Sequence, residues 1–431
     1  MKNAIMAAAI ATTVSAAPAP PGRIPRASLP TTNDVIPVRS LGEVSVNKPG
    51  FATVMNMGGS NSLLLSQFQA FGDDSVSRID DLAGLVKSGD FSDAKVSKVS
   101  GSVTWPNDVT AAPSDVFGTD GFVVAGGFLV PGKGNGGIWF SPTSSTGQSG
   151  KLVKLGGQSG WFYHRVIFAD MDMDGQQEMV SCRAKKPLFG GTSTMLVYFK
   201  PSDPSNPTGT WTETEIGPGC DALFTLADLD GDGVPEIIAA SYFTSQLNLF
   251  TSSNKSKGFA DKSSVKTTLL DRSIGAAFDV QVVDINNDGK KDLLVTNHQG
   301  GGSNPSGSVY AYEVPSDITV AANYKRHVIA QNFPVTQGGL NQAAPGTATA
   351  FFPTKASQAG FPYIALAGDA AQIAYVLVPG ARAFEYQVTE LVNCGCTVGG
   401  LAVADVDGDG SVEIFVPCYD NGVVAAFSFG A

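Results

Sequence analysis

The sequence contains little of what helical, membrane-spanning or nucleic-acid-binding proteins are built from. Only 16% of its 431 residues are charged, and helical periodicity is confined to Asp74–Val86. No apolar run reaches the roughly 20 residues that a membrane-spanning helix needs. The formal net charge of −11 argues against nucleic acid as a partner. Glycine (50) and proline (25) are plentiful instead, which suits a turn-rich β protein.

Common catalytic signatures are also missing. The sequence has no Ser-His-Asp spacing, no glycine-rich loop of the kind that cradles phosphate and no CxxC pair. Hydrolase and nucleotide-binding functions therefore lack support. Histidine is scarce, with three residues in the chain. Because histidine titrates near neutral pH, a histidine near the axis is a candidate acid, base or metal ligand.

Cysteine is scarce as well, and the five present fit an oxidising compartment. Cys182 and Cys220 are expected at the same end of adjacent structural units, where they can pair. Cys418 is expected to pair with Cys394 or Cys396, which leaves one thiol over. A Cys/His metal site is the alternative use of these residues.

One nine-residue loop is present four times: DMDMDGQQE, DLDGDGVPE, DINNDGKKD and DVDGDGSVE. Ca²⁺ takes six to eight oxygen ligands from a chain that curls around it, and glycine at position 6 permits the positive φ of a tight reversal. The alternative, a solvated acidic turn, is disfavoured by the shared spacing of four copies. About four structural Ca²⁺ ions are expected. Their candidate ligands are Asp170, Asp172, Asp174 and Glu178; Asp228, Asp230, Asp232 and Glu236; Asp284, Asn286, Asp288 and Asp292; and Asp405, Asp407, Asp409 and Glu413.

The flanks of the loops distinguish them from EF-hands. An EF-hand needs glutamate at position 12 and a helix on each side. Position 12 here is Ser181, Ala239, Val295 or Val416, and the flanking runs are short, apolar and rich in β-branched residues, as in buried strands. The strand–loop–strand unit resembles the FG-GAP/VCBS repeat of integrin-α-like β-propellers. In that family the loop joins the two inner strands of a blade.

The spacing of the loops predicts seven units. Asp170 and Asp228 are 58 residues apart, Asp228 and Asp284 are 56 apart, and Asp284 and Asp405 are 121 apart, which is two periods. The hidden unit lies around Pro353, and two earlier units lack the ligand set. Periods of this length indicate a propeller or a solenoid.

A second series of segments favours closure into a ring. Six units end in a strand that alternates polar and apolar residues, and the last unit lacks one. The segment Val35–Gly42 can supply it, and this closure leaves no open sheet edge. We therefore predict an all-β fold: a seven-bladed propeller of four-stranded blades, the last closed by an N-terminal strand.

The N-terminal region predicts secretion. Residues 1–16 have the charged, apolar and small-residue regions of a signal peptide, 17–33 form a proline-rich disordered leader, and 34–431 form one propeller. An Ala-rich tail is the alternative to the signal peptide. Asn254-Lys255-Ser256 is a sequon, so a glycoprotein is expected. We expect a secreted monomer without a membrane span.

The face opposite the loops is the expected place for function, because different residues converge there near the axis. The ligand-binding candidates are Trp161, Tyr163, Arg165, Arg183 and Tyr242, and the catalytic candidates are His164, His298, Asp108 and Asp221. The alternatives are packing for the aromatic residues, solvation for the cations and local hydrogen bonding for the histidines. A further divalent metal at this axial mouth is left open.

Two functions follow. The first is a binding module for a carbohydrate or an extracellular protein. The second is a lyase, because WPNDV, GGFLVPGKGNGG and FYHRVIFADMDMDG resemble the propeller part of the aldos-2-ulose dehydratase family, which removes water from oxidised sugars. That resemblance implies a carbon–oxygen lyase acting on a keto-sugar, with His164 as general base. The family also carries cupin-like domains, for which this chain has no room.

Overall fold

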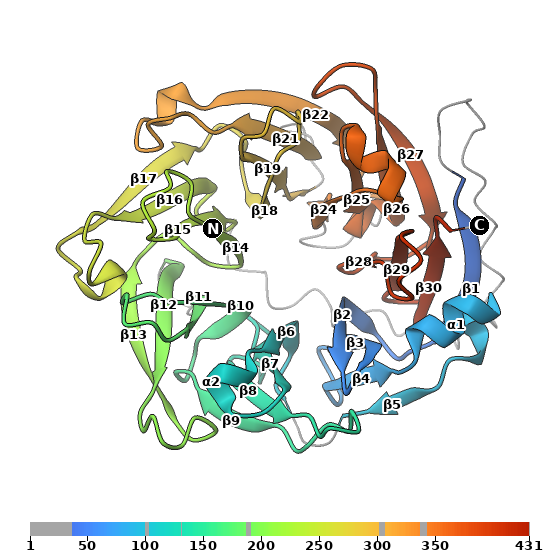
Figure 1. Ribbon diagram of the computed structural model, residues 1–431, viewed down its shortest axis with the longest axis horizontal. Helices are drawn as coiled ribbons and strands as arrows, with labels where there is room; N and C mark the ends of the chain where they lie inside the picture. The colour runs from blue at the N-terminus through green and yellow to red at the C-terminus, as the bar shows by residue number, and fades with distance from the viewer. Residues whose placement is uncertain are drawn as a thin grey trace.

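Seven four-stranded antiparallel sheets are arranged as blades around one axis (Figure 1). The computed structural model describes residues 37–99, 103–130, 132–186, 191–300, 307–336 and 343–430. The expected signal peptide and leader lie outside the described residues. The predicted all-β, seven-bladed propeller is confirmed.

The first three blades follow one another along the chain. Blade 1 contains β2 (Pro49–Met57), β3 (Ser60–Gln67), β4 (Ser75–Ile79) and β5 (Val96–Lys98). Blade 2 contains β6 (Pro106–Ala112), β7 (Gly121–Gly126), β8 (Gly137–Pro142) and β9 (Val153–Gly156). Blade 3 contains β10 (Phe162–Ala169), β11 (Glu178–Lys185), β12 (Ser193–Pro201) and β13 (Trp211–Gly217).

The next three blades repeat this order. Blade 4 contains β14 (Leu223–Ala227), β15 (Glu236–Ser241), β16 (Gln246–Ser252) and β17 (Val265–Asp271). Blade 5 contains β18 (Ala277–Val283), β19 (Asp292–Asn297), β21 (Gly307–Glu313) and β22 (Lys325–Phe333). Blade 6 contains β24 (Ala348–Phe351), β25 (Tyr363–Ala367), β26 (Ile373–Pro379) and β27 (Tyr386–Asn393). A small ladder of β20 (Gln299–Gly300) and β23 (Ala343–Ala344) joins blades 5 and 6.

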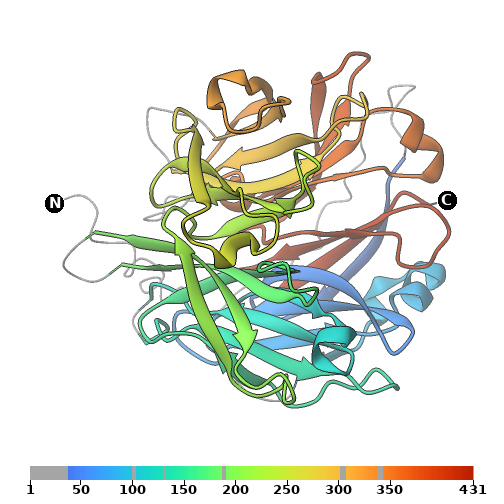
Figure 2. The ribbon, with the colours of Figure 1, turned by 60° about the vertical axis from the view of Figure 1, so that its left-hand side comes forward.

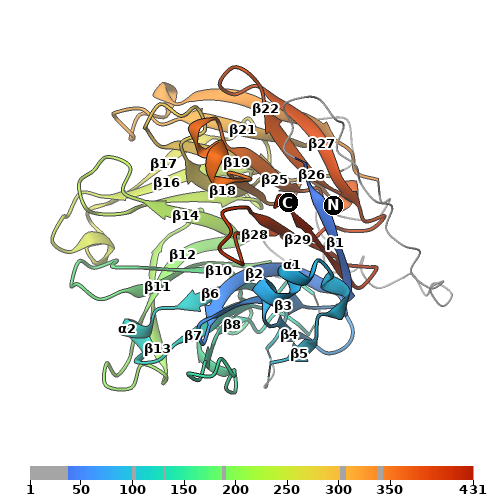
Figure 3. The same ribbon diagram turned by 45° about the vertical axis from the view of Figure 1, so that its right-hand side comes forward.

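Blade 7 combines the two ends of the described chain. It contains β28 (Ala402–Ala404), β29 (Glu413–Cys418), β30 (Val423–Ser428) and, as its outer strand, β1 (Arg39–Ser45). β1 pairs antiparallel with β30, with Val44 opposite Val424, and lies beside the last blade in Figure 3. The predicted closure is confirmed. The strand begins later than Val35–Gly42 suggested, and Val35 itself lies outside the described residues.

Helix is limited to short connections. In the described part of the chain the helices are α1 (Leu82–Ser88), α2 (Ser114–Phe117) and five 3₁₀ turns, η1 (Phe91–Asp93), η2 (Gly258–Ala260), η3 (Ala321–Asn323), η4 (Lys355–Ala359) and η5 (Asp369–Ala371). The helix expected over Asp74–Val86 is wrong in its first half, where β4 alternates polar and apolar residues. α1 begins after Asp81, whose side chain caps Gly84 N–H, and ends at Gly89. Among the described residues, no helix is both long and apolar enough to cross a membrane.

The core lies between blades. The seven large clusters of buried apolar residues each join two adjacent blades, and one of them contains both Leu63 of β3 and Phe415 of β29, across the closure. The second strands, such as β15 and β29, are buried along their whole length, which explains their continuous apolar runs. Loops gather on the two opposite faces of the ring (Figure 2). The acidic nine-residue loops follow the first strands and lie on one face. The candidate residues at the starts of first strands and the ends of second strands lie toward the opposite face.

Candidate functional site

The four predicted loops share one hydrogen-bonding pattern. Each joins the first and second strands of its blade, and the glycine at position 6 has a positive φ in all four copies, for example +89° at Gly175. The carboxylate at position 1 accepts from the glycine N–H, at 2.8 Å for Asp170. The carboxylate at position 9 accepts from the N–H at position 2, at 2.7 Å for Glu178 and Met171. The chain thus curls around a centre lined by oxygen atoms.

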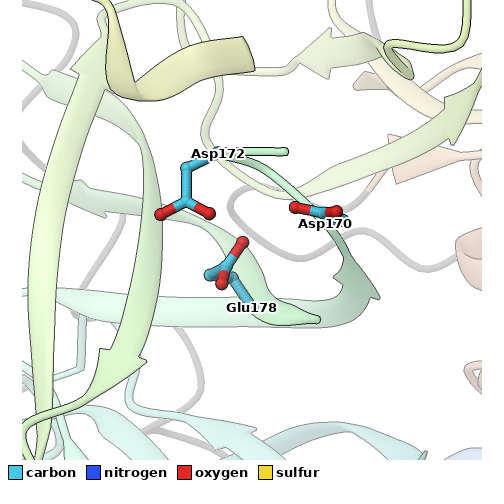
Figure 4. Close-up of side chains that lie close together, drawn as sticks. All are labelled: Asp170, Asp172 and Glu178. Carbon is cyan, nitrogen blue, oxygen red and sulfur yellow. The ribbon is translucent and has the colours of Figure 1, made fainter. Parts of the chain in front are cut away.

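Three loops bring carboxylates together closely enough to share one ion. The ligand oxygens of each group lie within 4.8 Å of one another: Asp170, Asp172 and Glu178; Asp228, Asp230 and Glu236; and Asp405, Asp407 and Glu413. Figure 4 shows the first group, in which the three side chains converge. Their position-5 partners Asp174, Asp232 and Asp409 accept from the N–H two residues later, which tightens the turn.

The loop of blade 5 differs at position 3. Asn286 accepts from the Asp288 N–H at 3.0 Å and donates to the Asp288 carboxylate at 3.3 Å. Asp284 and Asp292 keep the contacts of the other loops, with Gly289 N–H and Ile285 N–H. The amide of Asn286 replaces a carboxylate, so this loop carries one negative charge fewer at position 3 than the other three loops.

The electrostatics of the loops fit a cation. Burial raises the pKa of Glu178, Glu236 and Glu413 to about 7, and neighbouring aspartates add to the shift. Burial likewise raises the pKa of Asp292 to about 6. Asp172 Oδ1 is buried without a hydrogen-bond partner among the described residues. Crowded oxygen ligands with an unused buried oxygen are the donor set that Ca²⁺ prefers.

The opposite face carries a continuous chain of aromatic rings, which we call the aromatic belt. Its members follow the second strands or open the first strands of blades 7, 1, 2, 3, 4 and 5: Tyr419, Phe68, Trp105, Phe128, Phe162, Phe243, Tyr242, Phe278 and His298. Successive ring centroids lie between 4.4 and 6.3 Å apart. Apart from Trp105 and Phe162, the rings are half-buried, so part of each remains accessible.

Polar groups stand at the blade 5 end of the aromatic belt. His298 Nδ1 lies 2.9 Å from the Pro345 carbonyl oxygen, and its Nε2 lies 3.6 Å from Asp369 Oδ2. The His298 ring stacks on Phe278 and touches Tyr242 edge-on. Burial raises the pKa of Asp369 and that of Tyr242. A histidine, a carboxyl group and a phenol from three blades thus meet here.

Arg165 lies among the inner strands. Its Nε donates to Asp108 Oδ2 at 2.9 Å, and its Nη1 lies 3.4 Å from Asp279 Oδ1 and 3.3 Å from the Phe224 carbonyl oxygen. Burial opposes the charged form of Arg165, but the Asp108 and Asp279 carboxylates outweigh it and raise the pKa of the guanidinium. Arg165, predicted to bind a ligand, and Asp108, predicted to be catalytic, therefore form an ion pair with each other.

His164 is buried beside this cluster. Its ring meets Phe51 edge-on at 5.3 Å, and its Nδ1 has no hydrogen-bond partner among the described residues. Burial and the Arg165 charge lower the pKa of His164 to about 3. The ring is neutral at physiological pH.

The other predicted site residues are engaged within the fold. Trp161 is stacked by Arg183 at 4.1 Å, and Arg183 pairs with Glu213 and Glu215. Tyr163 is fully buried and donates to Glu213 at 2.7 Å. These contacts explain the placement of Trp161, Tyr163 and Arg183 without a ligand.

Asp221 is a turn cap. Its carboxylate accepts from the Tyr242 and Phe243 N–H groups, each at 2.8 Å, and it is fully buried. Burial raises the pKa of Asp221 to about 7. Asp221 therefore positions the two aromatic residues of blade 4 in the aromatic belt.

The cysteines form two disulfides. Cys182 pairs with Cys220 between blades 3 and 4, as expected, and Cys394 is the partner of Cys418. Cys396 is a buried free thiol. The Asn254 amide of the sequon donates to Asp261 at 2.8 Å, so this side chain is held by the local turn. Two disulfides suit an oxidising or extracellular environment.

Comparisons with known proteins agree with the fold. Residues 228–295, from the loop of blade 4 to β19, match the family model of the FG-GAP-like repeat. The resemblance to an FG-GAP-type β-propeller is thereby confirmed. No curated protein matches the chain.

Solved structures with a similar arrangement are remote in sequence. A proposed 6-phosphogluconolactonase from Bacteroides uniformis is 11% identical, with a TM-score of 0.47, over 83% of this chain and 87% of that one. Two glucose dehydrogenase structures are 12% and 10% identical, with TM-scores of 0.40 and 0.41. They cover 76% and 77% of this chain and 97% and 99% of theirs. These values carry no conclusion about function.

Proposed function

We propose that this FG-GAP-type propeller is a secreted, calcium-stabilised binding module that holds a carbohydrate on the face opposite its calcium loops. The observation that carries the proposal is the aromatic belt. Nine rings in contact across six blades leave accessible ring surface on one face. Sugar rings pack their C–H faces on such surfaces, while a few polar groups fix orientation.

The polar groups at the end of the aromatic belt suit hydroxyl recognition. The Asp369 side chain is 27% exposed and the His298 side chain 12%, so both present polar atoms at the surface. Carboxylate oxygens accept from hydroxyl groups, and imidazole nitrogens donate or accept. An extracellular protein ligand is the other occupant of this face, and the experiment below tells the two apart.

The calcium loops have a structural role in this proposal. They repeat on the face away from the aromatic belt and join inner strands, so an ion there neutralises crowded carboxylates and holds two strands together. Residues 1–16 act as the signal peptide, residues 34–431 as the folded unit, and the two disulfides accord with secretion. Asn254 is the proposed glycosylation site, and the propeller acts as a monomer.

The experiment is glycan-array binding by the parent protein and by Phe278→Ala. Phe278 contacts Tyr242 and His298 within the aromatic belt. Phe384→Ala is the matched control, because Phe384 stacks on His327, which lies on the outer strand β22 of blade 5. Loss of glycan binding in the first variant alone supports the proposal. Absence of glycan binding by the parent, with capture of a protein that depends on Phe278, favours the protein ligand.

A lyase is the second candidate, and His298 is the observation that favours it. His298 faces two acceptor oxygens and lies beside the Tyr242 phenol, an arrangement able to exchange protons. His164 suits the role of base less well, because a group whose pKa is about 3 accepts protons weakly at neutral pH. Turnover of a keto-sugar that is lost in His298→Ala would support this candidate, and intact turnover in that variant would count against it.

A further inference from the structure

A lysine ammonium lies among the carboxylates of the first proposed calcium loop, the loop of blade 3. Lys200 Nζ lies 2.5 Å from Asp172 Oδ2, 2.6 Å from Asp174 Oδ2 and 3.3 Å from Glu178 Oε1. These three residues are positions 3, 5 and 9 of the loop. The ammonium therefore contacts three of the four side chains that are the candidate ligands of this loop, all but Asp170.

The position of Lys200 is set by strand register. In blade 3, Met179 of β11 pairs with Phe199 of β12, so Glu178 lies opposite Lys200. The same register in blade 4 places Thr251 opposite Glu236, because Ile237 pairs with Phe250. In blades 5 and 7 the corresponding residues are Glu313, opposite Asp292, and Ser428, opposite Glu413. Lysine is present at this position in blade 3 alone of the four loop-bearing blades.

In blade 7 the residue opposite the position-9 carboxylate is a serine, Ser428. Ser428 Oγ donates to Glu413 Oε1 at 2.8 Å, which supports the position-9 carboxylate without adding charge. Lys200 instead brings a full positive charge to the same carboxylate position. Its side chain is 33% exposed, so its flexible stem has room to swing outward.

We propose that Lys200 is a built-in cation of the first loop that competes with calcium, so that this loop binds calcium more weakly than the loops of blades 4 and 7. Calcium binding there requires the ammonium to leave three carboxylates. In the blade 4 loop a lysine ammonium meets one carboxylate only, with Lys255 Nζ 3.6 Å from Asp232 Oδ2. The inference rests on the proposal that the loops bind calcium. It adds that the loops are unequal, and that the first keeps its shape when calcium is scarce.

The test is a reciprocal exchange between blades 3 and 4. Lys200→Thr gives the first loop the residue of blade 4, and Thr251→Lys gives blade 4 the residue of blade 3. Calcium alone is titrated into each purified full-length protein, and isothermal calorimetry yields the number of ions and their affinities. We expect Lys200→Thr to tighten one site by on the order of tenfold and Thr251→Lys to weaken one by a similar factor.

Thermal unfolding in excess chelator provides a second readout. Without calcium, Lys200→Thr should melt below the parent, because three carboxylates then lack a counter-charge. Identical ion numbers and affinities in the parent and Lys200→Thr would overturn this inference and leave the calcium role of the loops intact. Absence of calcium binding by all three proteins would overturn both proposals. Circular dichroism of each variant in calcium checks that the propeller has formed.

Discussion

The burial of His164 makes the free energy of unfolding depend on pH. Its pKa is lowered to about 3 by burial and by Arg165, whereas an unfolded histidine has a pKa of about 6.5. Below pH 6.5 the unfolded chain binds a proton that the folded chain does not, so the stability contribution of His164 falls as the pH falls toward 3.

The first prediction follows from this linkage. Replacing His164 with Phe removes the titration and keeps an aromatic ring against Phe51. Between pH 7 and pH 5, the parent should lose about 2 kcal/mol more of unfolding free energy than the variant. Urea unfolding at the two pH values measures this. Equal losses in both proteins would show that His164 titrates normally in the folded state.

At the scale of the residue, spacing in the sequence indicates which side chains of the loops lie close together. The ligand spacing of the loops placed Asp228, Asp230 and Glu236 together, and the structure brings their oxygens within 4.8 Å. Spacing could not give side-chain direction on the other face. The register of β10 against β11 shifts between Tyr163 and Val166, so strict alternation does not tell which side chains face the axis.

The aromatic belt was only partly predictable. The sequence makes Tyr242 a candidate because it follows the second strand of blade 4. Phe68, Phe128, Phe243 and Phe278 are not among the sequence candidates. Their significance lies in ring contacts between blades, which depend on the packing of segments distant in sequence. The positions at the ends of first and second strands were the available signal.

At the scale of the element, repulsion between the carboxylates of a loop opposes the ion binding proposed for it. The loop of blade 7 carries Asp405, Asp407 and Glu413 within 4.8 Å, whereas that of blade 5 has Asn286 where blade 7 has Asp407. The natural asparagine shows that this fold accepts an amide at position 3. The exchange removes one negative charge with little change in shape.

The second prediction uses that exchange. Asp407→Asn should weaken calcium binding at one site and, in chelator, raise the unfolding free energy by roughly 0.5–1 kcal/mol, because a like-charge contact is lost. Calcium titration and urea unfolding, each with and without chelator, measure the two effects. Lower stability of the variant in both conditions would mean that Asp407 stabilises the turn independently of an ion.

The closing strand β1 is the second element whose contribution to the free energy of unfolding can be measured. β1 buries Leu41 and Val44 and covers β30, which would otherwise be an open edge. Each buried aliphatic side chain contributes about 1.5–3 kcal/mol.

The third prediction concerns this strand. A chain that starts at Val46 and lacks β1 should melt at least about 5 °C below one that starts at Pro37. The Pro37 chain is the control, because it keeps all of β1. The comparison is made by calorimetry in calcium. Equal melting temperatures would show that pairing with β30 adds nothing to the closed ring.

At the scale of the whole molecule, the proposed calcium loops and the interblade cores would stabilise different contacts, those within a blade and those between blades. The cores hold neighbouring blades together, whereas each loop ties the first two strands of one blade, and β1 joins the ends of the chain. Loss of the ions should therefore loosen individual blades without removing the contacts between them.

The fourth prediction tests this division. An ion present at 100 times its dissociation constant stabilises the folded state by about 2.7 kcal/mol per site, so the two strong sites of blades 4 and 7 raise the melting temperature of a chain of this size by about 6 °C. Chelation should lower the melting temperature by that amount and leave the folded-state circular dichroism at 25 °C in place, because the cores persist. Magnesium chloride in place of calcium is the control, since Mg²⁺ keeps its own water and fits such flexible cages poorly. A melting temperature indifferent to chelator would mean that the hydrogen bonds of the loops suffice without an ion, and the stabilising role proposed for calcium would fail for the molecule as a whole.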